Sequence, residues 1–350
     1  MLPAAPGPGS PVHRLSPHAR RVFYRSDTQE LKELQTMNTM STPLSGHQFS
    51  LAHGEYRAIV ASVGASLRVL RHRDRELVVP YAPDEVRPAF RGAILAPWPN
   101  RVINGRYTDG GQVQQLALTE PERGHALHGL LVWHDFTDEE IAPDRIVLVA
   151  RLPAQQGYPH PLQVRVEYRL DDDGLSTTVT GTNLGRSVAP WGTGPHPYLV
   201  AGAGRVDQWF LELPAQTVLK VTPDRLIPDG LADVIDLEGG RFDFRTERSL
   251  SGAEIDHAFT DMPRDADGRA TVRVVDQIGK GVAVIFDSSC PWIQIHTADR
   301  PEPELNRIGL AVEPMTCAPD AFNSRAGLVR LPPGGSHSAR WRIQALEGRQ

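Results

Sequence analysis

The hydrophobic positions of this chain fall in short runs that are typical of β-strands. Residues 145–152 (RIVLVARL) and 162–170 (LQVRVEYRL) are rich in β-formers, and the second run alternates apolar and polar positions. An acidic cluster ending at Gly174 separates the second run from residues 175–183, which favours a hairpin because such clusters accept turn geometry. Similar runs occupy residues 209–213, 270–276, 281–287, 292–297, 309–314 and 339–346.

Glycine and proline punctuate these runs. The chain has 31 glycines and 30 prolines among 350 residues, more than the roughly 12% usual for globular proteins. Long helical patterns are absent between the runs. The pattern therefore predicts an all-β sandwich or barrel, formed as one domain by residues 46–347.

The N-terminal part of the sequence differs in composition from the rest of the chain. Residues 1–25 are rich in proline, glycine, serine and arginine, so we predict a disordered or poorly ordered extension over residues 1–45. Within it, apolar residues spaced three apart predict a short helix over residues 26–38.

The composition of the chain excludes some classes of binding partner. The hydrophobic fraction is 40% and the formal net charge is −5, which argues against nucleic acid or a membrane surface as partner, because both require a concentrated basic face. No apolar run is long enough to span a membrane. The two cysteines, Cys290 and Cys317, are interpreted as reduced thiols, so we expect a cytoplasmic protein.

A proline-rich loop is the first segment that suggests chemistry. Residues 96–101 contain two prolines, which a strand does not accommodate, so the segment is predicted to be rigid. It presents Trp98, Asn100 and Arg101 in fixed positions. The alternative is an ordinary proline turn with a surface arginine.

Two histidines three residues apart, His125 and His128, raise the question of a metal site. Glycines on both sides argue against a helix, and no nearby cluster of carboxylates or cysteines completes a zinc site. We therefore expect no metal. His128 is predicted to point into a cleft, and the alternative is a pair of loop histidines in water.

His196 is flanked by prolines, which fix its backbone on both sides. Gly192 and Gly194 allow the chain to approach another group closely. Trp191 and Tyr198 offer flat faces for a sugar ring. The alternative is a β-bulge loop with an incidental histidine.

Two other segments contain candidate carboxylates, Glu313 and Asp256. Glu313 closes an apolar run and is followed by proline, and a carboxylate at the end of a buried strand is costly unless it is paired or used. Asp256 lies in the segment 254–259, whose acidic residues are equally consistent with a solvated loop. Gln294 lies within the predicted strand 292–297.

Taken together and in order, these segments resemble the aldose 1-epimerase (galactose mutarotase) family, in its bacterial branch. The resemblance spans roughly residues 46–347. Its most specific pieces are residues 97–107 (PWPNRVINGRY), 125–130 (HALHGL), 192–199 (GTGPHPYL), 256–259 (DHAF) and 311–323 (AVEPMTCAPDAFN).

The resemblance implies a galactose mutarotase-like β-supersandwich with an open substrate cleft. It implies interconversion of the α and β anomers of a free aldose, with Glu313 as general base and His196 as general acid. The positions that match sugar contacts are Trp98, Asn100, Arg101, His128, Asp256 and Gln294. It also implies a monosaccharide partner, no cofactor, and a monomer or homodimer.

The residue types suit this chemistry. Mutarotation removes a proton from the C1 hydroxyl and delivers one to the ring oxygen, and reference pKa values of about 4.3 for Glu and about 6.5 for His allow both roles. We expect the His196 imidazole to keep its proton beside carboxylates.

One alternative function is that of a hexose-6-phosphate mutarotase, with Arg71, Arg73 and Arg75 as candidate phosphate ligands. Another is a catalytically silent sugar-binding homologue.

Overall fold

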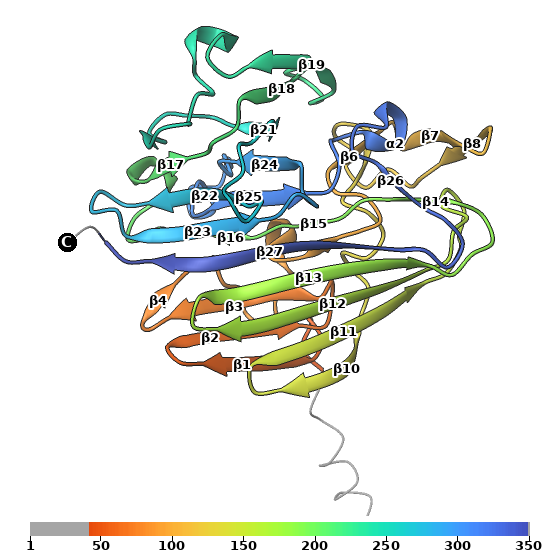
Figure 1. Ribbon diagram of the computed structural model, residues 1–350, viewed down its shortest axis with the longest axis horizontal. Helices are drawn as coiled ribbons and strands as arrows, with labels where there is room; N and C mark the ends of the chain where they lie inside the picture. Colours follow the sequence, from red (N-terminus) through yellow and green to blue (C-terminus); the bar gives the residue numbers. More distant parts are fainter. Residues whose placement is uncertain (1–41, 349–350) are drawn as a thin grey trace, which may run out of the picture. The chain divides into compact units, whose positions relative to one another are not determined.

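A nine-stranded antiparallel sheet is the largest in the computed structural model, which describes residues 42–348 (Figure 1). In spatial order its strands are β10 (Thr137–Ala142), β11 (Arg145–Leu152), β12 (Leu162–Asp171), β13 (Gly174–Asn183), β27 (Ser336–Leu346), β23 (Gly281–Phe286), β22 (Ala270–Val275), β17 (Phe210–Glu212) and β20 (Arg248–Ser249). The strands predicted at 145–152, 270–276, 281–287 and 339–346 are therefore confirmed, with ends that shift by a few residues.

The predicted hairpin is formed by β12 and β13. Leu162 pairs with Asn183 and Asp171 with Gly174, so the register runs without a bulge from one end to the other. Gly174 has a φ of 119°, a conformation that L side chains rarely adopt. Buried residues alternate with half-exposed ones along both strands, because one face of the sheet packs on the core and the other faces solvent.

A four-stranded antiparallel sheet covers the inner face of this hairpin. Its strands are β1 (Gln48–His53), β2 (Tyr56–Ala61), β3 (Ser66–His72) and β4 (Arg75–Glu76). Leu51 and Val60 belong to the same buried core as Val164 and Val166 of β12. Figure 1 shows β1 to β3 alongside β10 to β13, and the two sheets form the sandwich that the resemblance implied.

A six-stranded antiparallel sheet carries most of the chemistry. In spatial order it contains β16 (Tyr198–Leu199), β25 (Leu310–Met315), β24 (Trp292–His296), β21 (Asp256–Thr260), β18 (Thr217–Val221) and β19 (Pro228–Asp233). Ile293, Ile295 and Val312 point into the main core. Because side chains alternate across a strand, Gln294 and Glu313 project from the opposite face of the same sheet.

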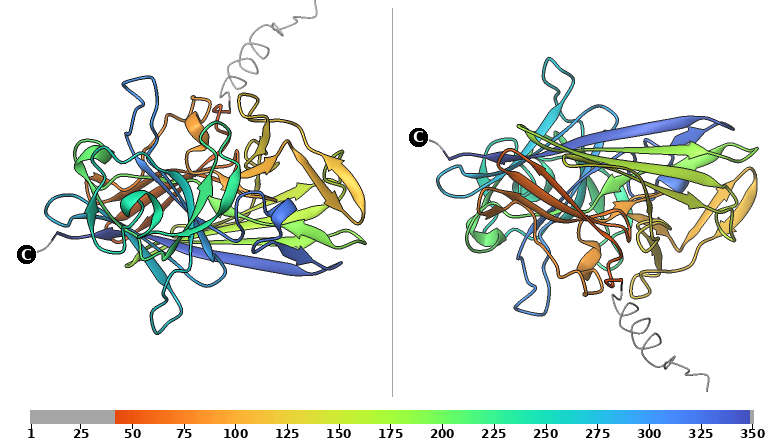
Figure 2. Two further views of the ribbon diagram at one scale, coloured as in Figure 1. Left: turned by 90° about the horizontal axis from the view of Figure 1, so that it is seen from above. Right: turned by 90° about the horizontal axis from the view of Figure 1, so that it is seen from below.

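Short pairs and single turns connect the sheets (Figure 2). The pairs are β5 (Ile94–Leu95) with β15 (Gly194–Pro195), β6 (Arg101–Ile103) with β9 (His125–Leu127), β7 (Arg106–Asp109) with β8 (Gln112–Gln115), and β14 (Ala189–Trp191) with β26 (Val329–Leu331). The helical turns are η1 (Pro88–Phe90), η2 (Val206–Gln208), η3 (Leu237–Gly239) and α2 (Ala321–Ser324). These pairs bring the proline-rich loop and the two histidine segments to the six-stranded sheet.

Four expectations concern the N-terminal segment, the cysteines and membrane-spanning segments. The helix predicted over residues 26–38 lies outside the described residues. Ser45, which was assigned to the extension, is buried and donates from Oγ to the Pro83 carbonyl at 2.7 Å. Cys290 and Cys317 are buried free thiols. No helix within residues 42–348 is long and apolar enough to cross a membrane.

Candidate active site

A cavity of about 200 Å³ lies against the polar face of β21, β24 and β25. Its lining brings together residues that are more than 200 positions apart in the sequence. Of the eight residues predicted to bind or transform substrate, those that line it are Asn100, Arg101, His128, His196, Asp256, Gln294 and Glu313.

Strand register positions three of these side chains. Gln294 of β24 lies directly opposite Glu313 of β25. On the other side, Asp256 of β21 lies opposite His296 of β24. Gln294 Nε2 donates to Asp256 Oδ1 at 2.6 Å, which fixes both groups at the floor of the cavity.

The His196 loop is pressed against the strand that carries Glu313. A Cβ added at Gly194 would lie 2.6 Å from the Pro314 carbonyl oxygen, and one at Gly192 would lie 2.5 Å from Cys317 Sγ. The two glycines therefore permit close approach to β25 and to the chain that follows it. The His196 backbone is also hydrogen-bonded, its N–H donating to the Ala93 carbonyl at 3.0 Å.

This approach places the predicted acid beside the predicted base. Nε2 of His196 lies 3.5 Å from Oε1 of Glu313. Exposure is 5% for His196 and 2% for Glu313. Both side chains are therefore almost fully buried where they line the cavity.

Burial changes the proton affinity of both groups. It raises the pKa of Glu313 well above the ordinary value, with Asp256 adding to the effect and Arg101 opposing it. It lowers the pKa of His196 to about 3, and the neighbouring His296 acts in the same direction. The expectation that His196 keeps its proton beside carboxylates is therefore wrong, because desolvation outweighs the nearby carboxylates.

The environment of the cavity also shifts the pKa values of His128 and Asp256. Burial, followed by His196 and Arg101, holds the pKa of His128 well below its usual range. Burial acts to raise the pKa of Asp256, but His296, Arg101 and the hydrogen bond from Gln294 lower it below the ordinary value. The cavity thus combines an ionised Asp256 with the neutral imidazoles of His128 and His196.

Asn100 and His128 are held by left-handed backbone conformations. Their φ angles are 55° and 63°, which are uncommon for residues other than glycine. The His128 N–H donates to the Asn100 carbonyl at 2.9 Å, so the two segments fix each other. Strain held in this way is often found at binding sites.

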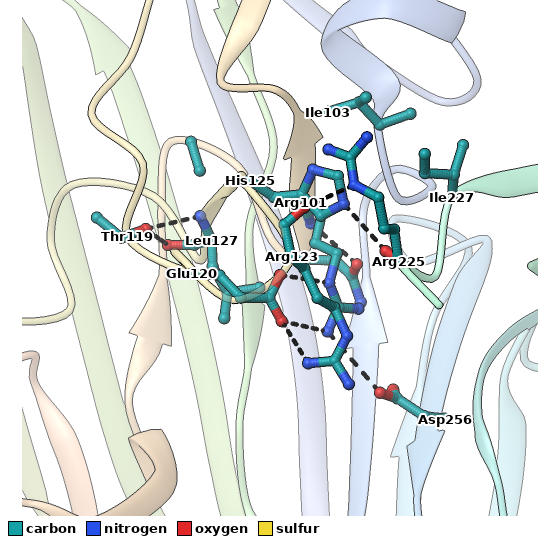
Figure 3. Close-up of polar contacts among 12 residues, drawn as sticks. Arg101, Ile103, Thr119, Glu120, Arg123, His125, Leu127, Arg225, Ile227 and Asp256 are labelled. Carbon is teal, nitrogen blue, oxygen red and sulfur yellow. Dashed lines mark hydrogen bonds and ion pairs between the residues drawn. The ribbon is translucent and has the colours of Figure 1, made fainter. Parts of the chain in front are cut away.

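Arg101 is fixed by a residue that the sequence interpretation missed (Figure 3). Glu120 accepts hydrogen bonds from Nε and Nη2 of Arg101, both at 2.8 Å. Arg101 Nη2 also lies 3.8 Å from Asp256 Oδ2. Glu120 lies in a turn-like acidic segment, and no sequence pattern connects it to an arginine 19 positions earlier.

His296 is a second missed residue. It lines the cavity two positions after Gln294 on the same strand. The period of two in β-strands predicts that both side chains face the same way, so this signal was available in the sequence.

Several cavity atoms lack partners among the described residues. Buried atoms without a hydrogen bond within residues 42–348 include His128 Nδ1, His196 Nδ1, Gln294 Oε1, His296 Nδ1 and Glu313 Oε2. All five residues line the cavity. Because buried polar atoms are normally hydrogen-bonded, this concentration indicates a site for a polar ligand.

Two tryptophans do not have the predicted positions. Trp98 is 3% exposed and packs edge-on against Phe322, with ring centroids 5.4 Å apart, so it contributes to the core and not to the cavity lining. Trp191 is fully buried. Tyr198 does line the cavity, stacked beside His196 at 5.2 Å.

The candidate phosphate ligands are also placed elsewhere. Arg71 pairs with Glu76 and Arg73 with Glu55, on the β1–β4 sheet. Arg75 donates to the backbone carbonyls of Gly281 and Leu346. These arginines have structural partners, so they are not the phosphate site proposed from their number.

His125 has a structural position. Its Nε2 donates to the Arg225 carbonyl at 2.9 Å, and its Nδ1 accepts from the Asn104 N–H at 3.2 Å. Both ring nitrogens are therefore occupied. Within residues 42–348 no group of three or more His, Cys, Asp or Glu side chains has the arrangement of a metal site.

Fold and cavity define an all-β sandwich protein with a buried carboxylate–imidazole pair in a polar cavity. The sequence matches the family described as aldose 1-epimerase over residues 47–344. Because this match covers most of the chain, the protein belongs to the aldose 1-epimerase family, and the resemblance of its motifs is confirmed.

Relatives of known sequence include characterised and uncharacterised proteins. The uncharacterized protein YihR of Escherichia coli K12 is 35% identical over 308 residues, which cover 88% of this chain and 96% of YihR. The aldose 1-epimerase of E. coli K12 is 26% identical over 229 residues, 60% of this chain and 64% of that enzyme.

Solved structures share the fold. The GalM/aldose epimerase homologue from C. elegans has a TM-score of 0.73 and 20% identity, over 86% of this chain and 99% of that one. A galactose mutarotase-like protein from Clostridium acetobutylicum has a TM-score of 0.74 and 17% identity, over 86% and 95% of the two chains. These likenesses confirm the mutarotase-like sandwich.

Proposed function

We propose that the protein is an aldose 1-epimerase that interconverts the α and β anomers of a free aldose by acid–base ring opening and closure. The observation that carries the proposal is the buried pair of Glu313 and His196, 3.5 Å apart in a cavity whose polar atoms lack partners among the described residues. Glu313 acts on the C1 hydroxyl and His196 on the ring oxygen O5.

Ring opening moves two protons. With the shared proton on His196, the Glu313 carboxylate removes the proton of the C1 hydroxyl while the C1–O5 bond breaks. O5 takes the proton from His196, and C1 becomes an aldehyde carbonyl. The pair ends as neutral glutamic acid and neutral imidazole, which are the forms that burial favours.

Ring closure reverses these transfers after rotation about the C1–C2 bond. O5 returns its proton to His196 and attacks the other face of C1, while the aldehyde oxygen on C1 receives the proton held by Glu313 and becomes the C1 hydroxyl again. Arg101, Asn100 and Asp256 bind sugar hydroxyl groups, and His128 and Arg101 steady charge near the reacting atoms. The reaction needs no metal or redox cofactor.

A polarimetric screen of free aldoses tests this proposal. Wild-type protein should accelerate mutarotation of at least one aldose, and Glu313→Gln should lose about 10²-fold or more of the catalysed rate because it removes the base. Glu167→Gln is the control, since Glu167 forms a two-point pair with Arg145 at 2.8 and 3.1 Å, outside the cavity. Equal rates in wild type and Glu313→Gln would contradict the proposal.

A sugar with an anionic substituent is the second candidate substrate. Arg91 is 8% exposed, its Nε lacks a partner within residues 42–348, and its Nη1 has one long contact with the Pro80 carbonyl at 3.5 Å. Arg91 and Arg300 line a second pocket that shares Tyr198 and Arg300 with the main cavity. Glu302 also lines this pocket, but Arg91 forms no ion pair among residues 42–348, and a buried guanidinium without a carboxylate partner favours an anionic ligand.

Adding hexose 6-phosphates to the polarimetric screen decides between the two substrate classes. Faster catalysed exchange of glucose 6-phosphate or galactose 6-phosphate than of the free hexoses would identify the anionic class. Faster exchange of the free hexoses would identify the neutral class.

A further inference from the structure

We propose that Glu120 is a positioning residue for sugar binding: its carboxylate fixes the plane of the Arg101 guanidinium and holds Arg101 Nη2 at 3.8 Å from Asp256, beyond hydrogen-bond distance. This inference rests on the proposed function, because it concerns how the same cavity holds its sugar. In this role Glu120 transfers no proton to or from the sugar and acts only through Arg101.

Two hydrogen bonds define the orientation of Arg101 (Figure 3). Nε donates to Glu120 Oε2 and Nη2 to Glu120 Oε1, both at 2.8 Å. A two-point contact of this kind fixes the guanidinium plane, which a single contact does not. Arg101 Nη1 has no such contact among residues 42–348, so it is the nitrogen available to a sugar hydroxyl.

The charge of Glu120 matters as much as its geometry. Arg101 is 8% exposed and Glu120 4%, and a buried cation requires a partner. Asp256 Oδ2 lies 3.8 Å from Arg101 Nη2. If Glu120 loses its charge, we expect Arg101 to move onto Asp256, where it would compete with the sugar hydroxyls for that carboxylate.

Glu120 is itself held by its own loop. Arg123 Nη1 donates to Glu120 Oε1 at 3.0 Å. The Glu120 N–H donates to the His125 carbonyl at 3.0 Å, and the Gly124 N–H donates to the Glu120 carbonyl at 2.8 Å. The carboxylate therefore reaches Arg101 from a fixed backbone.

Arg225 ties this loop to the hairpin of β18 and β19. Its Nε donates to the Arg123 carbonyl at 2.8 Å, and its Nη2 donates to Asn104 Oδ1 at 2.6 Å. The Arg225 carbonyl accepts from His125 Nε2. Through these contacts, visible in Figure 3, His125 and the β18–β19 hairpin both hold the segment that carries Glu120.

A double-mutant cycle separates positioning from general stabilisation. The variants are Glu120→Gln, Arg101→Met and both together, with Glu167→Gln as the matched control that breaks a comparable two-point pair. If Glu120 acts through Arg101, Glu120→Gln lowers kcat/KM by about 10²-fold in the wild-type background, since small misplacements of binding groups have effects of this size. In the Arg101→Met background the same change has no further effect.

The outcomes are distinct. Equal losses in both backgrounds, or no loss in wild type, would overturn the proposal. Thermal unfolding identifies variants that fail to fold, and Glu120→Asp, which keeps the charge but shortens the reach, then replaces Glu120→Gln in the cycle. If wild-type protein binds a sugar without catalysing exchange, the proposed function fails, and the same cycle measured on the sugar Kd still decides the role of Glu120.

Discussion

At the scale of single residues, burial determines what Glu313 and His196 can do. The same desolvation raises the pKa of one and lowers the pKa of the other, so a single proton is shared over a wide pH range. Both directions favour the form in which Glu313 carries this proton. The catalytic arrangement, with the proton on His196, is the less populated one, and ring opening returns the pair to its favoured form.

The dependence of kcat/KM on pH should follow the single proton of the pair. Activity is lost as pH falls towards the His196 pKa of about 3, because the pair gains a second proton. Activity is lost again as pH rises through the raised pKa of Glu313, because the pair then has no proton to give. Between these limits kcat/KM should be level. A rate that rises steadily with pH across the neutral range, after subtraction of the uncatalysed reaction, would contradict this account.

Sequence patterns located most of the cavity, and the exceptions have physical reasons. Glu313 and His196 lie in segments whose prolines and glycines marked them, and the order of the motifs supplied their roles. Glu120 was missed because its meaning depends on a contact with Arg101 across a loop. Trp98 was misassigned because a rigid loop exposes some of its residues to a cavity and buries others in the core.

At the scale of elements, the site depends on how closely the His196 loop approaches β25. The register of β24 and β25 places Gln294 beside Glu313. The strand runs of 281–287, 292–297 and 309–314 were predictable, since β-branched and other apolar residues are continuous in the first and alternate with or lead up to polar residues in the other two. The strand β19 (PDGLAD) was not, because its residues disfavour strands and it is held in place by its pairing with β18.

Substitution of Gly194 by alanine tests the close approach. The new Cβ would lie 2.6 Å from the Pro314 carbonyl oxygen, so the loop must shift and His196 must move from Glu313. We expect kcat to fall by about 10²-fold and the free energy of unfolding to fall by about 1–3 kcal/mol. Gly202→Ala is the control, because the three atoms nearest to its Cβ would all belong to the Asp276 side chain, with Oδ2 at 3.2 Å. Equal kcat values in the two variants would contradict this role of Gly194.

At the scale of the whole molecule, the sandwich serves as a rigid support for a cavity built from distant segments. The one-sided burial of β12 and β13 stabilises the sandwich. The six-stranded sheet has one face in the main core and projects Gln294 and Glu313 from the other. The class of fold followed from strand patterns and glycine and proline content, whereas the pairing of the sheets depends on contacts between segments far apart in the chain.

One-dimensional exchange NMR at anomeric equilibrium tests the central claim most directly, because it measures sugar binding and anomer exchange in the same sample. The account predicts that wild-type protein accelerates exchange between the anomers, and that Glu313→Gln and His196→Asn still bind the sugar but lose about 10²-fold or more of the exchange rate. Binding by the wild-type protein without any acceleration of exchange would contradict the account and identify a silent sugar-binding homologue.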